Sequence, residues 1–330
     1  MEPWSITTIL VAFGGGVFGA ALGGLWSIIL CALLVLAGSA VVMAGGTDFL
    51  LMQVALGPVF GPHVGGFAAG IAAATYAAGV KKNQPNGDAK DIVSPLVDTS
   101  WDVLAMGGLF AVLGHILAQI IPQIPIVNQT DGLAFNIFLT AVIARLLFYG
   151  GEMPWGKKES IQKYGYLGTN NYAISWMPYM SQPGKLLMLG IGVGTISPAM
   201  AMMAQKQLAP LVAKGAVAES TAFVVALLMG WTLAILALLL LNAATGSAQK
   251  VPITHCIADL SALAFLLTGS FGLAVIVGIL AAFWEELWAR MVWNHGSNHI
   301  DPPATAIAFG TLVLAILLKP EFLNLAQLFK

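Results

Sequence analysis

Long stretches without a charged residue are the feature that most constrains how this chain can fold. Residues 5–46 hold no Asp, Glu, Lys or Arg, and one bilayer crossing takes about 20 apolar residues, so this run is long enough for two crossings. Only 9% of the 330 residues are charged, against about 25% in soluble domains. Strands of membrane barrels alternate apolar and polar residues, whereas these runs are unbroken. The sequence therefore predicts an all-α polytopic membrane protein.

The apolar runs and the polar residues between them predict about nine transmembrane helices. Two lie within residues 5–46, and the others are at 63–80, 94–121, 132–150, 186–204, 221–243, 270–288 and 302–318. Two further segments, residues 47–60 and 251–268, are apolar but carry prolines, histidines and carboxylates. Polar, helix-breaking sequence at membrane depth is tolerated where protein or a wet cavity covers it. We expect both segments to be re-entrant or broken, and whether they cross fully stays open.

The chain also matches itself at a constant offset of 208 positions, which predicts an internal repeat. The matched pairs include Gly38 with Gly246, Gly61 with Gly269, Gly70 with Gly278, Asn86 with Asn294 and Pro95 with Pro303. Identities of glycine are weak evidence in such a composition, but the order of spans, broken segments and loops corresponds as well. Five crossings separate equivalent points, so the second copy is expected to be inverted. The predicted units are residues 1–150 and 186–330, joined by a polar, aromatic-rich loop at 151–185.

The distribution of lysines predicts an orientation in the membrane. Loops on one side of this topology carry ten lysines: residues 81, 82, 90, 157, 158, 163, 185, 250, 319 and 330. Loops on the other side carry Lys206, Lys214 and Arg290. By the positive-inside rule the first side is cytoplasmic. We therefore expect a cell inner (plasma) membrane protein with its N-terminus outside and its C-terminus in the cytoplasm.

The first interrupted segment supplies candidate solute-binding residues. Thr47 and Asp48 follow a pair of glycines, and His63 follows Gly61 and Pro62 at the start of a span. A carboxylate here can bind a cation or a proton, or cap a half-helix whose N-terminus faces the solute. The imidazole can bind a polar solute or titrate. The alternative is that these side chains are solvated at an interface.

The second interrupted segment supplies Thr254, His255 and Asp259. If this segment is helical, His255 and Asp259 are four residues apart and share one face. The pair then predicts a proton relay or a cation site. The alternative is a buried pair that satisfies itself and only fixes packing.

Two predicted helix starts carry further acidic candidates. Ser94, Asp98 and Asp102 lie at the start of one span, where acidic side chains also favour the positive end of any helix without further function. His299 and Asp301 precede prolines at the start of the last span, with Asp301 as the expected N-cap. Together with His295 they resemble no specific metal motif, so no metal site is predicted.

These features predict a secondary active transporter of a small polar or anionic solute, coupled to H⁺ or Na⁺. Helix starts near Asp48, His63, Ser94 and Pro302 can direct backbone N–H groups toward one solute. The sequence has no ATP-binding motif, and no enzymatic activity or cofactor is expected beyond the coupling ion. Expected partners are the bilayer and the solute, while a net charge of −1 speaks against nucleic acid.

Two other function classes stay open at this point. One is a passive channel for a small solute. The other is a membrane enzyme, or a subunit of a larger complex, that acts on a lipid-soluble substrate. The identity of the solute, the coupling ion and a homo-oligomeric state are not specified by the sequence.

Overall fold

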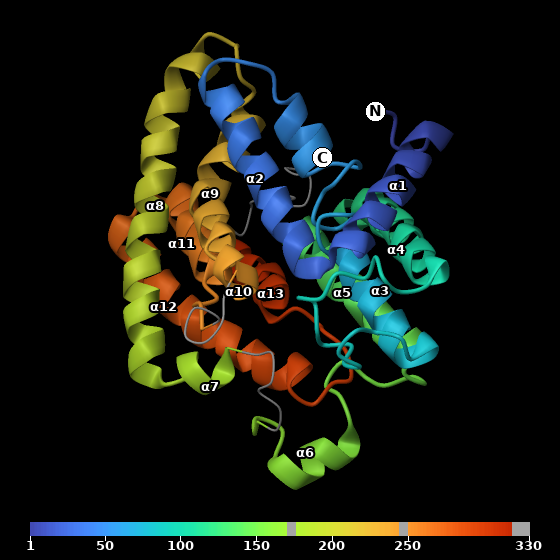
Figure 1. The fold of residues 1–330 in the computed structure, drawn as a ribbon. Helices are drawn as coiled ribbons and strands as arrows, with labels where there is room; N and C mark the ends of the chain where they lie inside the picture. Colours follow the sequence, from blue (N-terminus) through green and yellow to red (C-terminus); the bar gives the residue numbers. More distant parts are fainter. Residues whose placement is uncertain (170–175, 244–249, 319–330) are drawn as a thin grey trace.

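The computed structural model describes residues 1–169, 176–243 and 250–318, and every regular element in these ranges is a helix (Figure 1). The first half forms α1 (Ile6–Leu22), α2 (Gly24–Met43), α3 (Ala68–Tyr76), α4 (Trp101–Ile120) and α5 (Gly132–Phe148). The connecting region holds α6 (Lys158–Tyr164) and α7 (Met177–Met180). The second half forms α8 (Pro183–Ala213), α9 (Glu219–Leu236), α10 (Leu239–Ala243), α11 (His255–Thr268), α12 (Phe271–Trp288) and α13 (Pro302–Leu318). The predicted all-helical fold is confirmed for this part of the chain.

Within the described residues, five helical segments are long and apolar enough to cross a membrane. They are Gly24–Met43, Trp101–Gln123, Pro183–Ala213, Glu219–Leu241 and Phe271–Trp293. Shorter apolar helices occupy Ile6–Leu22, Gly132–Phe148, His255–Thr268 and Pro302–Leu318. By length and composition these elements are those of an integral membrane protein.

The two interrupted segments fold differently from each other. The first contains only a π-helical stretch, Leu50–Ala55, followed by turns that extend to α3. Close packing restricts which residues this segment can hold, because a Cβ at Gly57 would lie 2.4 Å from the carbonyl oxygen of Met52. The second interrupted segment is irregular to Thr254 and then forms the regular 14-residue helix α11.

Two predicted spans begin later than the sequence suggested. The expected span at 63–80 is reduced to α3 and a π-helical turn, Ala77–Lys81, because glycine-rich turns occupy the chain before it. Helix α4 begins at Trp101 and not near residue 94. The Asp91 side chain accepts hydrogen bonds from the backbone N–H groups of Val93 and Ser94, and this stabilises a local turn in place of a helix.

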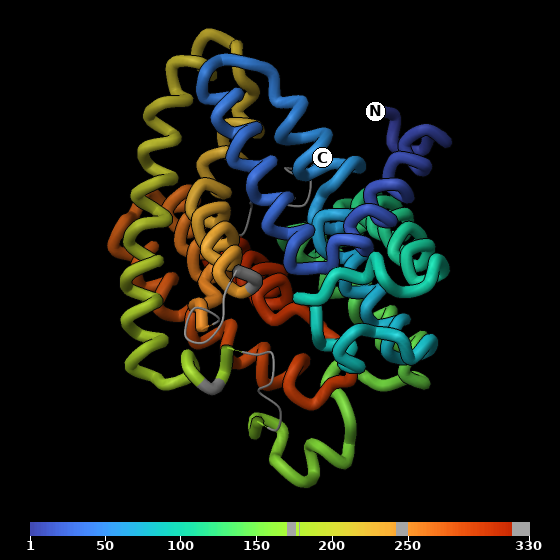
Figure 2. The backbone as a smooth tube through the Cα atoms, in the orientation of Figure 1, coloured from blue at the N-terminus to red at the C-terminus, as the bar shows by residue number. Residues whose placement is uncertain are grey.

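The two halves of the chain pack side by side and meet along central helices. In Figures 1 and 2, α1, α3, α4 and α5 lie on one side, and α8, α9, α11 and α12 on the other. Helix α2 contacts α9, and α13 contacts both α5 and α11, so these contacts join the halves. Residues 170–175, 244–249 and 319–330 lie outside the described residues, including Gly246 of the repeat and Lys319 and Lys330 of the lysine pattern.

Glycines allow the closest helix contacts, as in many membrane bundles. Helices α8 and α12 cross where a Cβ added at Gly278 would lie 2.6 Å from the Cα of Gly194. On the other side of the molecule, a Cβ added at Gly19 of α1 would lie 1.9 Å from the carbonyl oxygen of Gly65. Any larger residue at these crossings would force the backbones apart.

Candidate functional site

A cavity of about 130 Å³ lies where the two halves of the chain meet. Its wall is mostly apolar and includes the aromatic rings of Phe67, Trp176 and Trp231. Both interrupted segments contribute to it, the first through Leu56 and the second through residues 253, 255 and 259. The polar residues of the lining are Asp131, His255, Asp259, His299 and Asp301. We call these five residues the cavity polar cluster.

Three helices begin at this cavity. Asp131 caps α5, since its Oδ1 accepts hydrogen bonds from Leu133 N at 2.9 Å and Ala134 N at 2.8 Å. Asp301 caps α13, and its Oδ2 accepts from Ala304 N at 2.8 Å. Helix α11 begins at His255 without a side-chain cap. The positive ends of α5 and α13 are thus already occupied by carboxylates of the chain itself.

A short chain of hydrogen bonds orients His299 in the cavity wall. Trp293 Nε1 donates to His299 Nδ1 at 3.1 Å, and His299 Nε2 lies 3.0 Å from Asp301 Oδ1. Since an indole nitrogen can only donate, Nδ1 of His299 is the acceptor, and the ring proton of the neutral imidazole is on Nε2. His299 therefore donates to Asp301 and holds that carboxylate in place.

His255 and Asp259 face the same cavity from α11 but have unpaired polar atoms. Within the described part of the chain, His255 Nδ1 and Asp259 Oδ2 are buried and have no hydrogen-bond partner. Leaving a buried polar atom unpaired costs about 1–3 kcal/mol. The pair therefore does not satisfy itself, which was the alternative explanation for its spacing.

A second cavity, of about 160 Å³, lies on the far side of two leucines. Leu56 and Leu133 line both cavities and so form part of the wall between them. The second cavity is lined by His63 and His115 among others. His63 is buried and its Nδ1 has no partner among the described residues, whereas His115 Nε2 lies 2.7 Å from Pro3 O.

The candidates of the first interrupted segment are thus dispersed. His63 lies in the second cavity. Thr47 and Asp48 are exposed, and Asp48 Oδ2 accepts a hydrogen bond from Thr221 Oγ1 at 2.9 Å. Thr254, from the second segment, is buried as the residue that precedes α11.

The candidates near the start of α4 also lie away from both cavities. Ser94 Oγ donates to Asp91 Oδ2 at 2.6 Å within the loop, and Asp98 is exposed. Asp102 Oδ2 lies 2.8 Å from Lys81 Nζ and accepts from Tyr76 OH at 3.2 Å. The structure therefore groups the second-half candidates around one cavity but not those of the first half.

An arginine at the end of α5 holds the segment that leads to Asp301. The Arg145 side chain is fully buried. Its Nε donates to Asn298 Oδ1 at 2.5 Å and its Nη1 to Pro154 O at 2.5 Å. Its Nη2 donates to Val292 O and Asn298 O, both at 2.9 Å. We call these contacts the Arg145 network.

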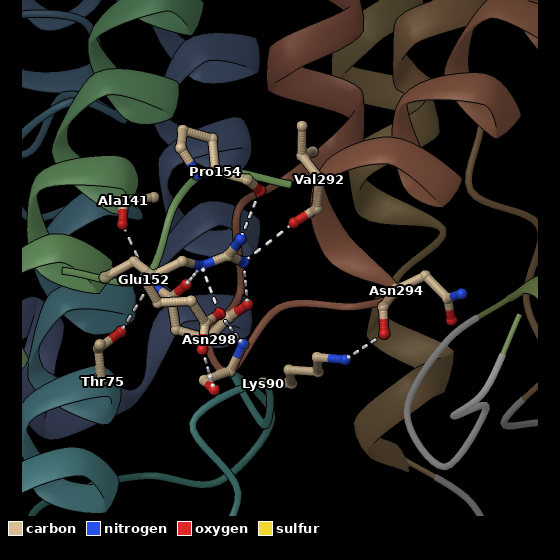
Figure 3. A network of polar contacts seen from close by, with 10 residues as sticks. Thr75, Lys90, Ala141, Glu152, Pro154, Val292, Asn294 and Asn298 are labelled. Atoms are coloured by element: carbon tan, nitrogen blue, oxygen red, sulfur yellow. Dashed lines mark hydrogen bonds and ion pairs between the residues drawn. The ribbon is translucent and has the colours of Figure 1, made fainter. Parts of the chain in front are cut away.

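Further bonds extend this network to neighbouring elements. Asn298 Nδ2 donates to Thr75 Oγ1 at 3.2 Å and to Ala141 O at 3.1 Å. Glu152 accepts from Ser297 N at 2.8 Å and from Ser297 Oγ at 2.6 Å. Figure 3 shows these groups converging from both halves of the chain. The segment between α12 and α13 is thereby fixed next to the cavity.

Sequence reasoning missed two buried carboxylates, Asp131 and Glu285. An aspartate directly before Gly132 is a recognisable N-cap signal, but no local pattern shows that this helix start lies at the cavity. Glu285 lies next to Glu286 on α12, and nothing in the local sequence distinguishes the two. Arg290 pairs with Glu286, at 2.9 Å, whereas Glu285 is fully buried.

No group of three or more His, Cys, Asp or Glu side chains within the described ranges is arranged to hold a metal ion. The fold and the cavity define a helical membrane protein with a small internal cavity that carries carboxyl and imidazole groups. Within that class, the chain belongs to a family of unknown function (DUF7973), whose model matches residues 1–328. Comparison with curated proteins gives no match, and comparison with solved structures gives none either.

Proposed function

We propose that this protein is a secondary active transporter that binds a small solute in the cavity between its two halves and couples its movement to a cation. The observation that carries the proposal is the unpaired Asp259 beside His255, in a cavity that both interrupted segments line. Ionisable groups inside a membrane are costly and are typical of ion or substrate pathways. A carboxyl group here is stable once a proton or a cation neutralises it.

The cavity favours a different class of solute from the polar or anionic one that the sequence predicted. The positive ends of α5 and α13 are capped by Asp131 and Asp301, so they offer little to an anion. Carboxyl groups attract a cationic or hydrogen-bond-donating group, and aromatic rings accommodate cations and apolar surface. We infer a small solute with an apolar body and a neutral or cationic polar group.

The wall between the two cavities supports alternating access. Leu56 follows the π-helical stretch of the first interrupted segment and Leu133 lies in the first turn of α5, and both line the two cavities. Movement of the broken segment relative to α5 would open that wall without unfolding a regular helix. Helix termini and breaks beside a binding site are a recurrent transporter design.

The proposal includes the nine crossings, the inverted repeat and the external N-terminus. Repetition is supported by π-helical turns that directly follow α3 at Ala77–Lys81 and α12 at Ala289–Trp293. Both turns lead into polar loops that precede an apolar helix, α4 in the first half and α13 in the second. Cysteine-accessibility labelling from each side of the membrane, at exposed loop positions in the two halves, would test this topology.

A binding screen followed by flux measurements tests the proposed function. The purified protein is first screened by thermal shift against small amines, amino acids, nucleobases, carboxylic acids and simple cations. Hits are then tested for uptake into proteoliposomes under an imposed H⁺ or Na⁺ gradient. We expect accumulation against the solute gradient, lost in Asp259→Asn and retained in Asp98→Asn, a control at an exposed loop carboxylate.

Two results would contradict the proposal. Flux that only dissipates the solute gradient and ignores both ion gradients would identify a passive channel. A solute whose binding and uptake are unchanged in Asp259→Asn would show that the transport site lies outside this cavity.

A further inference from the structure

We propose that Glu285 is the proton-binding residue through which this transporter couples solute movement to H⁺, an inference that depends on the proposed function. Glu285 lies on α12 and is not part of the cavity lining. Its side chain is 0% exposed, and among the described residues neither carboxyl oxygen has a hydrogen-bond partner. Glu285 belongs neither to the cavity polar cluster nor to the Arg145 network.

Among the described residues, no positively charged side chain pairs with Glu285. Arg290 lies one turn away, but its Nε and Nη2 both donate to Glu286 Oε1, at 3.0 and 2.9 Å. The carboxyl groups that interact electrostatically with Glu285 are those of Asp301 and Glu286. Ionising Glu285 would place its negative charge close to these two carboxyl groups. Their repulsion raises the free-energy cost of ionising Glu285 further.

Among the described residues, no Lys or Arg of the helices packed against α12 bonds to Glu285, and α11 carries the titratable side chains of His255 and Asp259 besides that of Cys256. Helix α11 brings the buried thiol of Cys256 close to Glu285. The charged residues of α8 are Lys185 and Lys206, and both are exposed. Asp301 is the charged residue at the start of α13. A buried carboxyl group in this setting is stable as the neutral acid.

The chemistry of the site favours a proton over a metal cation. Hard metal cations require several oxygen ligands, and within the described residues no group of three or more His, Cys, Asp or Glu side chains could hold a metal ion. A proton needs only one carboxyl oxygen as its ligand. Once the proton is bound, Glu285 is a neutral acid, and nearby negative charges no longer repel it. Binding and release of one H⁺ involves no other bond change.

Asp301 connects Glu285 with the solute cavity. It lines the cavity, accepts from His299 and interacts electrostatically with both Glu285 and His255. When a cationic or hydrogen-bonding solute binds to Asp301, the electrostatic potential at Glu285 becomes less negative. When the solute leaves, the potential becomes more negative again. Proton binding at Glu285 and solute binding in the cavity are therefore linked, and the linkage is reciprocal.

The test compares Glu285→Gln with Glu219→Gln, at an exposed glutamate in the first turn of α9, in proteoliposomes. Glutamine mimics the neutral acid, so in Glu285→Gln we expect solute exchange to persist while H⁺-driven accumulation falls at least tenfold. Proton movement opposite to that of the solute, followed by an internal pH dye, should disappear as well. Glu219→Gln should keep both. Infrared spectroscopy adds an independent readout, because the C=O absorption of protonated buried carboxyl groups should lose the contribution of Glu285 in Glu285→Gln and keep it in Glu219→Gln.

The outcomes separate this inference from the proposed function. If the wild type accumulates the solute and Glu285→Gln remains coupled to H⁺, or if accumulation follows Na⁺ alone, Glu285 is not the coupling residue and the transporter assignment stands. If the wild type moves no solute from the screen, the proposed function fails, and the coupling role fails with it.

Discussion

Two regions of this molecule bury charged side chains a short distance apart, and they treat them in opposite ways. In the Arg145 network, one guanidinium donates four hydrogen bonds to oxygen acceptors. In the region of the cavity and α12, Asp259 Oδ2 and both oxygens of Glu285 lack a partner among the described residues. Both regions are equally well buried, so burial alone does not distinguish them.

Under the proposed function, the difference separates a structural role from a functional one. A buried charge with all its hydrogen bonds made fixes neighbouring segments, and its removal leaves several acceptors unpaired. A buried charge without partners destabilises the folded state. We therefore expect a ligand or a proton to neutralise it or to hydrogen-bond to it. Mutations in the two regions should therefore move stability in opposite directions.

The largest expected effect is the loss of the Arg145 network. Arg145→Gln removes most donors from four buried acceptors and should destabilise the protein by about 3–5 kcal/mol, seen as a lower unfolding temperature and a lower yield in detergent. Arg290→Gln is the matched control, since this arginine is partly exposed and bonds mainly to Glu286 and Leu167. Equal stability of the two variants would show that the Arg145 network does not hold the fold.

The wall between the cavities predicts a smaller loss of stability together with a loss of coupling. Leu133→Ala should cost about 2 kcal/mol, the low end for a buried leucine, because cavities already lie on both sides of this side chain. It should also allow solute to leak down its own gradient without the coupling ion. Leu109→Ala, at an exposed position of α4, is the control and should change neither. Tight coupling in Leu133→Ala would exclude this leucine as a barrier.

The unpaired carboxylate predicts a gain in stability. Asp259→Leu replaces a buried polar group of similar size with an apolar one, and should raise the free energy of unfolding by about 1–2 kcal/mol. The same variant should lose solute binding in the thermal-shift screen. A lower stability of Asp259→Leu would mean that Asp259 has a structural partner, and the contrast with Arg145 would disappear.

The sequence predicted the helical class well because that prediction depends on composition and run length alone. It also placed His255 and Asp259 on one helical face, since the four-residue spacing is a local property of any helix. His299 and Asp301 were found through an N-cap pattern that is equally local. These four residues are the part of the cavity polar cluster that local signals can identify.

The rest of the site depends on tertiary contacts that no local pattern carries. Asp131 and Asp259 come from helices more than a hundred residues apart, and only the packing of α5 against α13 and of α13 against α11 brings them to one cavity. Asp48, Asp98 and Asp102 resembled them in sequence, yet loop and surface packing leaves them exposed or paired with Lys81 and Thr221. Glu285 and Glu286 are adjacent, and only the direction of each side chain decides that Glu286 meets Arg290.

The smallest expected effect comes from Lys90. Its hydrogen bonding is intermediate between that of Arg145 and that of the unpaired carboxyl groups. Its Nζ donates to Asn294 O at 3.0 Å and lies 4.2 Å from the centroid of the Trp293 ring, so it is only partly satisfied (Figure 3). Burial lowers the pKa of this loop lysine to about 8, against 10.5 when solvated; Asp88 opposes the shift, and Arg145 and Lys157 add to it. Because the unfolded chain binds more protons between these pKa values, stability should rise with pH in that window. The gain from pH 8 to pH 9 should be about 1 kcal/mol.

Thermal unfolding of Lys90→Met over this range should lack that increment, whereas Lys82→Met, at an exposed lysine of the same loop, should keep it. An unchanged pH profile in Lys90→Met would show that Lys90 is fully stabilised as a cation, and would place it with Arg145 rather than with the unpaired groups.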